Sequence, residues 1–216
     1  MPHLDDIEAY ISVDVEASGP VPGKYSMLSV GACLVEDPSK EFYCEIKPIS
    51  LEYVEEALKV SGFSLEKLTA DGETPVHAMQ KLSEWTAAVS DSREPVLVGF
   101  NASFDWSFIN YFVGRNVFGI GALDIKAYYM GKAAVRWRET KSSKLPQHLT
   151  PTRPLSENHN ALADAKYQAE VFRRLITRAL LSSPLILLPA RARLRCFSGR
   201  VPETISPSAL LCTEAC

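Results

Sequence analysis

Two acidic side chains, Asp14 and Glu16, stand two positions apart in the stretch 10–18. Their neighbours Val13 and Val15 are β-branched, which favours a strand. Because side chains alternate along a strand, both carboxylates point to the same face, roughly 6.5–7 Å apart along the chain. Two carboxylates on a covered face raise each other's pKa unless a cation lies between them. The pair therefore predicts half of a divalent-metal site; the alternative is an exposed strand edge with two solvated acids.

A third acid, Asp105, lies at a predicted junction between a strand and a helix. The apolar run 95–100 is typical of a buried strand, and Asp105 falls in the first turn of the helix expected after it. Sites in α/β proteins usually lie at this edge of the sheet. A carboxylate in a first helical turn is also stabilised by the helix dipole, so this position alone requires no function.

A fourth acid, Asp164, follows His159 by five residues near the start of a predicted helix. Each helical residue turns about 100°, so on one continuous helix the two side chains would be well apart. We therefore place His159 in the loop before the helix, free to reach over the site. A lone histidine is more often structural, but one placed just ahead of an acid that faces other acids is a candidate general base.

The elements that must position these residues follow from the hydrophobic pattern and the turn residues. Strands are expected at 10–16, 25–35, 41–46, 95–100 and 122–125. The short turn at 37–40 makes the second and third strands an antiparallel hairpin. Helices are expected within 51–70, from Pro75 to Val89, at 103–113 with Asn101 as N-cap, and at 161–179 with Asn158 or Asn160 as N-cap. Residues 131–156 form a polar excursion, and the whole pattern indicates an α/β domain with a mixed sheet.

Length and charge limit the class of protein. The 216 residues suffice for one domain, expected at 1–179, and a tail at 180–216 that is interrupted by prolines and expected to pack poorly. The net charge of −3 argues against a protein that coats long duplex DNA. No signal peptide is expected at the N-terminus, and no stretch is long enough to span a bilayer.

The cysteines indicate a reducing compartment. There are five, an odd number, and none forms a Cys-x-x-Cys pair, which favours the cytoplasm. Cys33 and Cys44 lie in apolar strand-like runs, where we expect them to be small core residues.

Taken together, three motifs resemble those of the DEDDh exonucleases, the superfamily of DnaQ-like proofreading subunits, RNase T and oligoribonuclease. The motifs are Asp14-x-Glu16, Asn101-x-x-Phe104-Asp105 and His159-Asn-Ala-Leu-Ala-Asp164-Ala. The resemblance spans residues 8 to about 178, and its motifs are specific jointly rather than singly. Two departures stand out: Phe100 occupies a position where many relatives carry histidine, and the tail has no counterpart.

This resemblance implies a ribonuclease H-like fold, a five-stranded mixed sheet flanked by helices. It implies 3′→5′ removal of nucleoside 5′-monophosphates from single-stranded DNA or RNA 3′ ends with two divalent cations, Mg²⁺ or Mn²⁺. By the same resemblance, Asp14, Glu16 and Asp164 hold the ion that carries the attacking water. Asp14 bridges to the second ion, Asp105 holds that ion, and His159 accepts the proton from the water.

The candidates for substrate binding are Ala17, Ser18, Met27, Asn101 and Lys144. The Ser18 hydroxyl is expected to bond a terminal 3′-hydroxyl, and Met27 or Leu28 to wedge against the last base. Four aromatic residues are candidates for base stacking, with core packing as the alternative: Trp106, Tyr128, Tyr129 and Trp137. A basic cluster in the excursion either meets phosphates or forms a solvated loop: Arg136, Arg138, Lys141 and Lys144.

Two rival functions remain at this stage. One is a non-catalytic module that binds nucleic acid or protein on the same fold. The other is an endonuclease or a phosphodiesterase that acts on other esters. The sequence leaves open the preference for RNA or DNA, the substrate length, the pathway and the oligomeric state, a homodimer included.

Overall fold

The computed structural model describes residues 7–112, 116–152 and 160–182, and these form a five-stranded sheet in the order β3-β2-β1-β4-β5. The strands are β1 (Glu8–Ala17), β2 (Met27–Leu34), β3 (Glu41–Glu45), β4 (Glu94–Gly99) and β5 (Leu123–Asp124). β1, β2 and β3 are antiparallel neighbours, whereas β4 is parallel to both β1 and β5. The predicted mixed sheet with an N-terminal hairpin is confirmed.

The helices are α1 (Glu55–Ser61), α2 (Leu65–Asp71), α3 (Pro75–Ser90), α4 (Ala102–Phe112), α5 (Ile125–Ala133) and α6 (Ala161–Ser182). The excursion carries three short 3₁₀ turns, η2 (Trp137–Glu139), η3 (Ser142–Lys144) and η4 (Gln147–Leu149). None of the described helices has both the length and the apolar character needed to cross a membrane. The expected tail lies almost wholly outside the described residues, since α6 ends at Ser182.

One of the two expected helix caps is confirmed. The Asn160 side chain accepts the N–H of Ala163 at 3.1 Å, which caps α6. For α4 the expectation was Asn101, but the N–H of Ala102 donates to Asp124 at 3.0 Å. The Asn101 side chain instead accepts a hydrogen bond from Lys126. Asp124 replaces the expected cap because β5 ends beside β4, where α4 begins.

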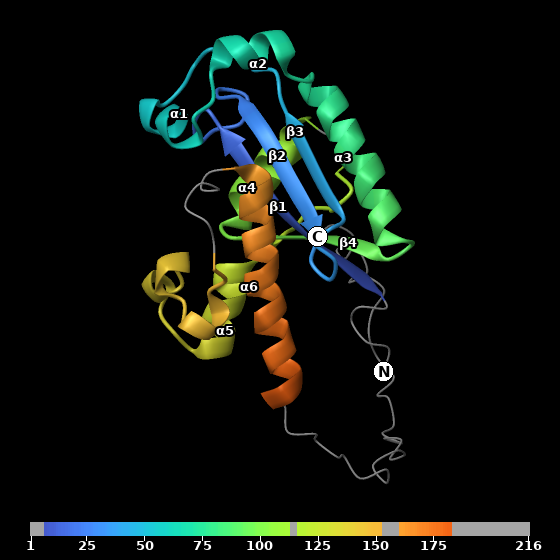
Figure 1. Cartoon of the computed structure of the whole chain (residues 1–216), viewed down its shortest axis with the longest axis vertical. Helices are drawn as coiled ribbons and strands as arrows, with labels where there is room; N and C mark the ends of the chain where they lie inside the picture. The colour runs from blue at the N-terminus through green and yellow to red at the C-terminus, as the bar shows by residue number, and fades with distance from the viewer. Residues whose placement is uncertain (1–6, 113–115, 153–159, 183–216) are drawn as a thin grey trace, which may run out of the picture. The chain divides into compact units, whose positions relative to one another are not determined.

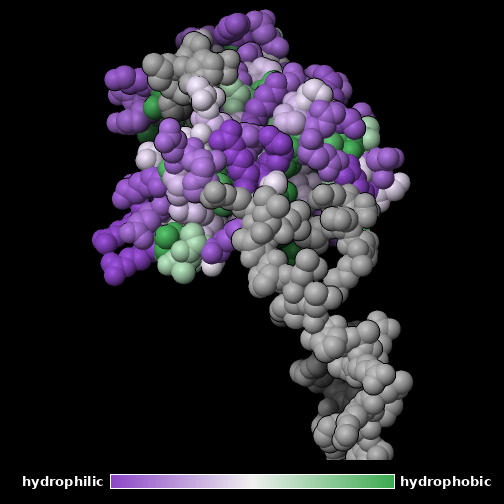
Figure 2. All heavy atoms as spheres, turned by 60° about the horizontal axis from the view of Figure 1, so that its bottom comes forward, coloured by the Kyte–Doolittle hydropathy of each residue, from purple (hydrophilic) through white to green (hydrophobic). Residues whose placement is uncertain are grey.

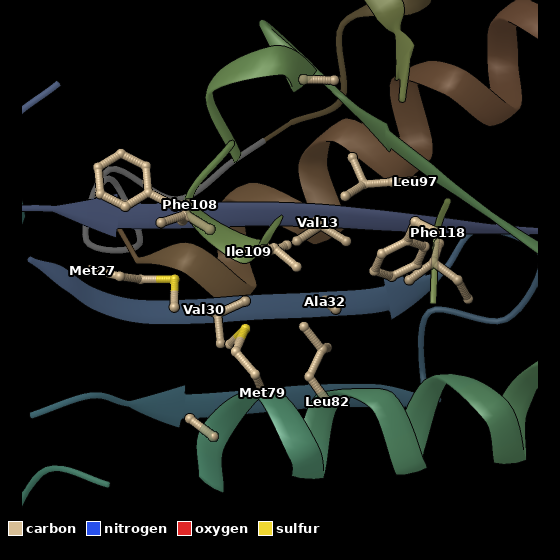
Figure 3. Close-up of a cluster of buried hydrophobic side chains, with 14 of the residues drawn as sticks. Val13, Met27, Val30, Ala32, Met79, Leu82, Leu97, Phe108, Ile109 and Phe118 are labelled. Carbon is tan, nitrogen blue, oxygen red and sulfur yellow. The ribbon is translucent and has the colours of Figure 1, made fainter. Parts of the chain in front are cut away.

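The two faces of β1 meet different layers. Its odd-numbered residues Ile11, Val13 and Val15 are buried in one core cluster with side chains of α3 and α4 (Figure 3). Its even-numbered residues face α6, which crosses the sheet in front in Figure 1. The Tyr10 ring centroid lies 5.3 Å from that of Phe172, and the Ser12 hydroxyl donates to the carbonyl of Ala165 at 2.8 Å.

The molecular surface is mostly polar on the face drawn in Figure 2. Hydrophilic side chains cover most of what is coloured there, and hydrophobic ones lie in small separate groups.

Gly31 allows the start of α6 to lie directly on the sheet. Gly31 is the β2 partner of Asp14. A Cβ atom at Gly31 would lie 2.2 Å from the nitrogen of Leu162 and 2.3 Å from the carbonyl carbon of Ala161. Since real Cβ atoms do not approach backbone so closely, this glycine is required for the first turn of α6 to lie beside Asp14.

We expect Gly31→Ala to lower the free energy of unfolding by about 1–3 kcal/mol, because the backbone of α6 must move away from the sheet. Urea denaturation measures the change. Gly121→Ala is the matched control, because no atom lies within 4 Å of the position of its Cβ. Equal stability of the two variants would show that α6 does not depend on this close approach.

Candidate active site

Three of the four predicted acids converge where β1 meets α6. Carboxylate oxygens of Asp14, Glu16 and Asp164 all lie within 4.8 Å of one another. Strand alternation places the first two on the α6 side of β1, and the close approach at Gly31 brings the third to them. Divalent cations such as Mg²⁺ take carboxylate oxygens as ligands, so this donor set fits such an ion.

The fourth acid, Asp105, is buried next to this group but is not part of it. Pairing between β1 and β4 ends at Ser12 and Val98. Beyond that point a carboxylate oxygen of Asp105 accepts the N–H of Val15 at 2.9 Å, in place of a neighbouring strand. The Asp105 side chain is 3% exposed. It therefore lies against the β1 backbone and accepts a hydrogen bond from it.

The electrostatics show that these acids are close enough to interact strongly. Burial, followed by the charges of Asp105, Asp164 and Glu16, raises the pKa of Asp14 well above its ordinary value. Burial also raises the pKa of Asp105, against the hydrogen bond from Val15. Carboxylates that raise each other's pKa are stabilised when a cation lies among them. The arrangement thus fits the predicted divalent cations.

His159 and Asn158 lie outside the described residues. The role of His159 as general base therefore remains a prediction.

A groove of about 810 Å³ opens beside the acids. Its lining includes Asp14 and Asp164 together with Asn101, Lys126 and Lys141. The Lys126 ammonium donates to the Asn101 side chain at 2.7 Å and lies 4.2 Å from the centre of the Trp137 ring. Trp137 is 51% exposed. Acidic and basic side chains therefore line one groove, and Trp137 packs against one of its lysines.

The sequence missed some of these groove residues. No sequence pattern identifies Lys126, because its place at the start of α5 depends on where β5 ends. Gln168, which also lines the groove, is one helical turn beyond Asp164, and that spacing was the available signal. Lys144 is exposed and is not among the described residues that line the groove, whereas Lys141 is.

Two of the predicted substrate contacts, Ser18 and Met27, are buried in this structure. The Ser18 hydroxyl is fully buried, donates to the carbonyl of Glu52 at 2.8 Å and accepts the N–H of Ser26 at 2.9 Å, so it fastens two loops. Met27 is 1% exposed and belongs to the main core, and the alternative Leu28 is fully buried in another cluster. Ala17 is buried as well, at 7% exposure. None of these side chains can act as a wedge without leaving the core.

Core packing accounts for three of the four candidate aromatics. Trp106 packs on the main core and donates to the carbonyl of Gly119 at 3.2 Å. Tyr128 lies edge-on to Phe172, with ring centroids 5.7 Å apart. Tyr129 is buried in the same cluster. Trp137 is the one of the four that is more than half exposed.

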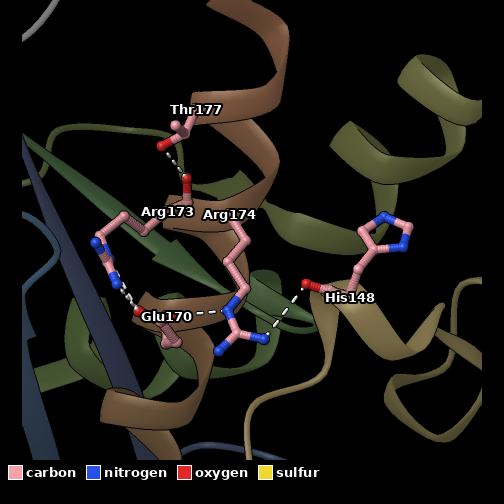
Figure 4. Close-up of polar contacts among 5 residues, drawn as sticks. All are labelled: His148, Glu170, Arg173, Arg174 and Thr177. Atoms are coloured by element: carbon pink, nitrogen blue, oxygen red, sulfur yellow. Dashed lines mark hydrogen bonds and ion pairs between the residues drawn. The ribbon is translucent and has the colours of Figure 1, made fainter. Parts of the chain in front are cut away.

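The excursion that carries Trp137 and Lys141 is fastened to α6. Arg174 donates to the carbonyl of His148 at 3.3 Å and pairs with Glu170 at 2.7 Å (Figure 4). Lys132 donates to the carbonyl of Leu175. The groove wall and the helix that supplies Asp164 are thus attached to each other.

Comparisons with known proteins agree with this geometry. Residues 9–176 match the family model described as the 3′-5′ exoribonuclease Rv2179c-like domain. The chain belongs to this family. The 3′-5′ DNA exonuclease Cap18 of Escherichia coli is 53% identical over 173 residues, which are 78% of this chain and 91% of that protein. The predicted enzyme class, a 3′-5′ exonuclease, is confirmed.

Solved structures confirm the ribonuclease H-like fold. A full-length 3′-exonuclease superposes with a TM-score of 0.63 at 15% identity over 79% of this chain. E. coli exonuclease I in complex with a dT13 oligonucleotide gives a TM-score of 0.60 at 15% identity over 81% of this chain. The chain spans 61% and 42% of the length of these two proteins. At such identities the likeness concerns the fold.

We expect the metal-free protein to lose stability relative to Asp14→Asn as the pH rises. Because the pKa of Asp14 is raised in the folded state, its proton stabilises the fold fully below the ordinary value of 3.8. That contribution disappears as the pH rises from there through the raised pKa. Urea denaturation in a chelator across this range measures the difference.

Asp71→Asn, at an exposed position on α2, is the control and should follow wild type. Parallel stability curves for wild type and Asp14→Asn would contradict the raised pKa of Asp14.

Proposed function

We propose that this exonuclease removes nucleoside 5′-monophosphates from the 3′ end of single-stranded DNA with two divalent cations, Mg²⁺ or Mn²⁺. The observation that carries the proposal is the convergence of Asp14, Glu16 and Asp164 within 4.8 Å, with Asp105 buried next to them. DNA is proposed because the relative that is 53% identical is named a DNA exonuclease, although the family model is described as exoribonuclease.

The four acids and His159 would have separate roles in the reaction. Asp14, Glu16 and Asp164 would hold one cation, and Asp14 with Asp105 the second. Bound cations of this kind activate a water and stabilise charge on the leaving oxygen. His159 would accept the proton of the attacking water, a role that suits a group whose pKa is near neutral.

The groove would hold the strand that leads to the cleaved bond. Lys126 and Lys141 offer positive charge to backbone phosphates in a chain whose net charge is −3. The exposed Trp137 offers a ring face on which a base can stack. The Asn101 amide, fastened to Lys126, would be a polar contact in the same path.

Other readings lose support. The non-catalytic module is disfavoured because half-buried acids that repel one another destabilise a fold that has no use for a cation. The endonuclease is disfavoured by the membership of the family. We also propose a cytoplasmic location, supported by the free thiols of Cys33 and Cys44.

We expect Asp14→Ala and Asp164→Ala to abolish activity and leave the fold intact, because each removes a cation ligand. His159→Ala should lower the rate by about 10²–10⁴-fold, the usual contribution of a general base. A 5′-labelled single strand, followed over time with Mn²⁺, measures both the rate and the pattern of cleavage.

Shortening from the 3′ end in single-nucleotide steps is the expected pattern. Internal cuts would contradict the exonuclease, and turnover by either aspartate variant would contradict the cation ligands. RNA of the same sequence forms the second arm, and faster degradation of RNA would contradict the proposed preference for DNA.

For the groove, we expect Lys126→Ala and Trp137→Ala to raise KM for a single strand of several nucleotides by roughly 5- to 150-fold. For Trp137 this range corresponds to about 1–3 kcal/mol for one base stacked on an aromatic ring, and for Lys126 a hydrogen bond to a charged phosphate is of similar size. Neither variant should change hydrolysis of the p-nitrophenyl ester of thymidine 5′-monophosphate, which has no further nucleotides. Lys144→Ala is the control, because Lys126 lines the groove and Trp137 packs against Lys126, whereas Lys144 is not among the described residues that line the groove. An equal effect of all three variants on the long substrate would remove the groove from the proposal.

A further inference from the structure

Gln168 connects three elements of the site. It lies on α6, four residues after Asp164, and its side-chain amide nitrogen donates to a carboxylate oxygen of Asp14 on β1 at 2.5 Å. Its amide oxygen accepts the N–H of Phe100, just beyond β4, at 2.7 Å. The side chain is 4% exposed. One buried amide thus joins β1, α6 and the start of the α4 segment.

These two partners fix the orientation of the amide. The N–H of Phe100 can only donate, so it requires the amide oxygen. An ionised Asp14 can only accept, so it requires the amide nitrogen. Both hydrogen-bonding ends of Gln168 are therefore used, and the side chain cannot turn without losing both bonds.

The backbone makes room for this arrangement. A Cβ atom at Gly99 would lie 3.1 Å from the amide oxygen of Gln168 and 3.2 Å from the carbonyl oxygen of Val13. Gly99 therefore allows Gln168 to reach the end of β4 unhindered. The small size of Gly99 and the reach of Gln168 thus both serve the hydrogen bond between Gln168 and Phe100.

The neutral charge of the Gln168 amide suits a position next to a cation site. Lysine or arginine would pair with Asp14 more strongly, but the added positive charge would oppose the binding of a cation. Gln168 holds one oxygen of Asp14 and adds no charge to the acidic group. Hydrogen bonds of this kind orient metal ligands and typically change metal affinity by 10- to 100-fold when they are removed.

We propose that Gln168 is a positioning residue for the divalent-cation site: it holds one carboxylate oxygen of Asp14 in place through a hydrogen bond and thereby sets the affinity of the site for the cation. This inference rests on the proposed function, because it assumes that Asp14 is a cation ligand. It goes further by assigning a role to a side chain that is not itself a ligand.

The test is a Mn²⁺ titration of the full chain that does not depend on activity. Thermal stabilisation and isothermal titration calorimetry both give the half-saturating Mn²⁺ concentration. Gln168→Met keeps an unbranched side chain of similar length and removes both hydrogen bonds. We expect it to raise the half-saturating concentration by about tenfold or more. Gln80→Met, at an exposed position on α3, is the matched control and should bind as wild type does.

Each outcome decides a different question. If Gln168→Met lowers the melting temperature without Mn²⁺ but leaves the half-saturating concentration unchanged, Gln168 is only a structural residue and the inference is wrong. If wild type itself is not stabilised by Mn²⁺, the proposed cation site fails instead.

A second variant serves if Gln168→Met does not fold. Gly99→Ala should press on the amide of Gln168 and raise the half-saturating concentration in the same direction by a smaller factor. A folded Gly99→Ala protein with wild-type Mn²⁺ affinity would overturn the inference.

Discussion

The structure depends on holding half-buried like charges together. Asp14, Glu16 and Asp164 share a small volume, and burial together with mutual repulsion raises the pKa of Asp14. Repulsion between the carboxylates opposes this arrangement, so the surrounding packing must help to impose it. The packing is provided on the opposite face of β1, where Ile11, Val13 and Val15 are fixed in the main core. Core packing on one face of β1 thus holds the acids on the other face in place.

A hydrogen bond and a close backbone approach between the sheet and α6 then set the position of this helix. The hydroxyl of Ser12 accounts for one contact with the helix backbone, and the missing side chain of Gly31 permits another. Because both residues are on or beside β1 at the level of the acids, small shifts of α6 would change the distance between Asp14 and Asp164. A catalytic group assembled from distant parts of a chain needs this kind of support from rigid elements.

Much of this could be predicted from the sequence where one local rule was enough. The alternation of Asp14 and Glu16, the short turn at 37–40 and the helix that begins at Pro75 all follow from local patterns. The predicted substrate contacts differ from the structure where both faces of a strand are buried or where the strand register changes. All eight residues of β2 are buried, so alternation could not show that Met27 and Leu28 enter separate clusters.

A register shift between Glu16 and Ala17 similarly breaks the alternation just before Ser18. The position of Ser18 therefore could not be extrapolated from the acids that precede it. The groove residues present a different difficulty, because Lys126 and Lys141 come to line one groove with Asp14 and Asp164 only through tertiary structure. No spacing in the sequence reports such a meeting.

Asp124 shows how the acids and the groove are made to depend on each other. One of its carboxylate oxygens accepts the N–H of Ala102 at the start of α4, at 3.0 Å, and the other accepts the N–H of Ala127 in the first turn of α5, at 2.8 Å. The first helix carries Asp105 and the second carries Lys126. Since one carboxylate fastens both helix starts, the buried acid and the basic wall of the groove keep a fixed separation. A strand bound along that wall would therefore meet the acidic group at a defined distance, which is the geometric requirement for cleaving one particular bond.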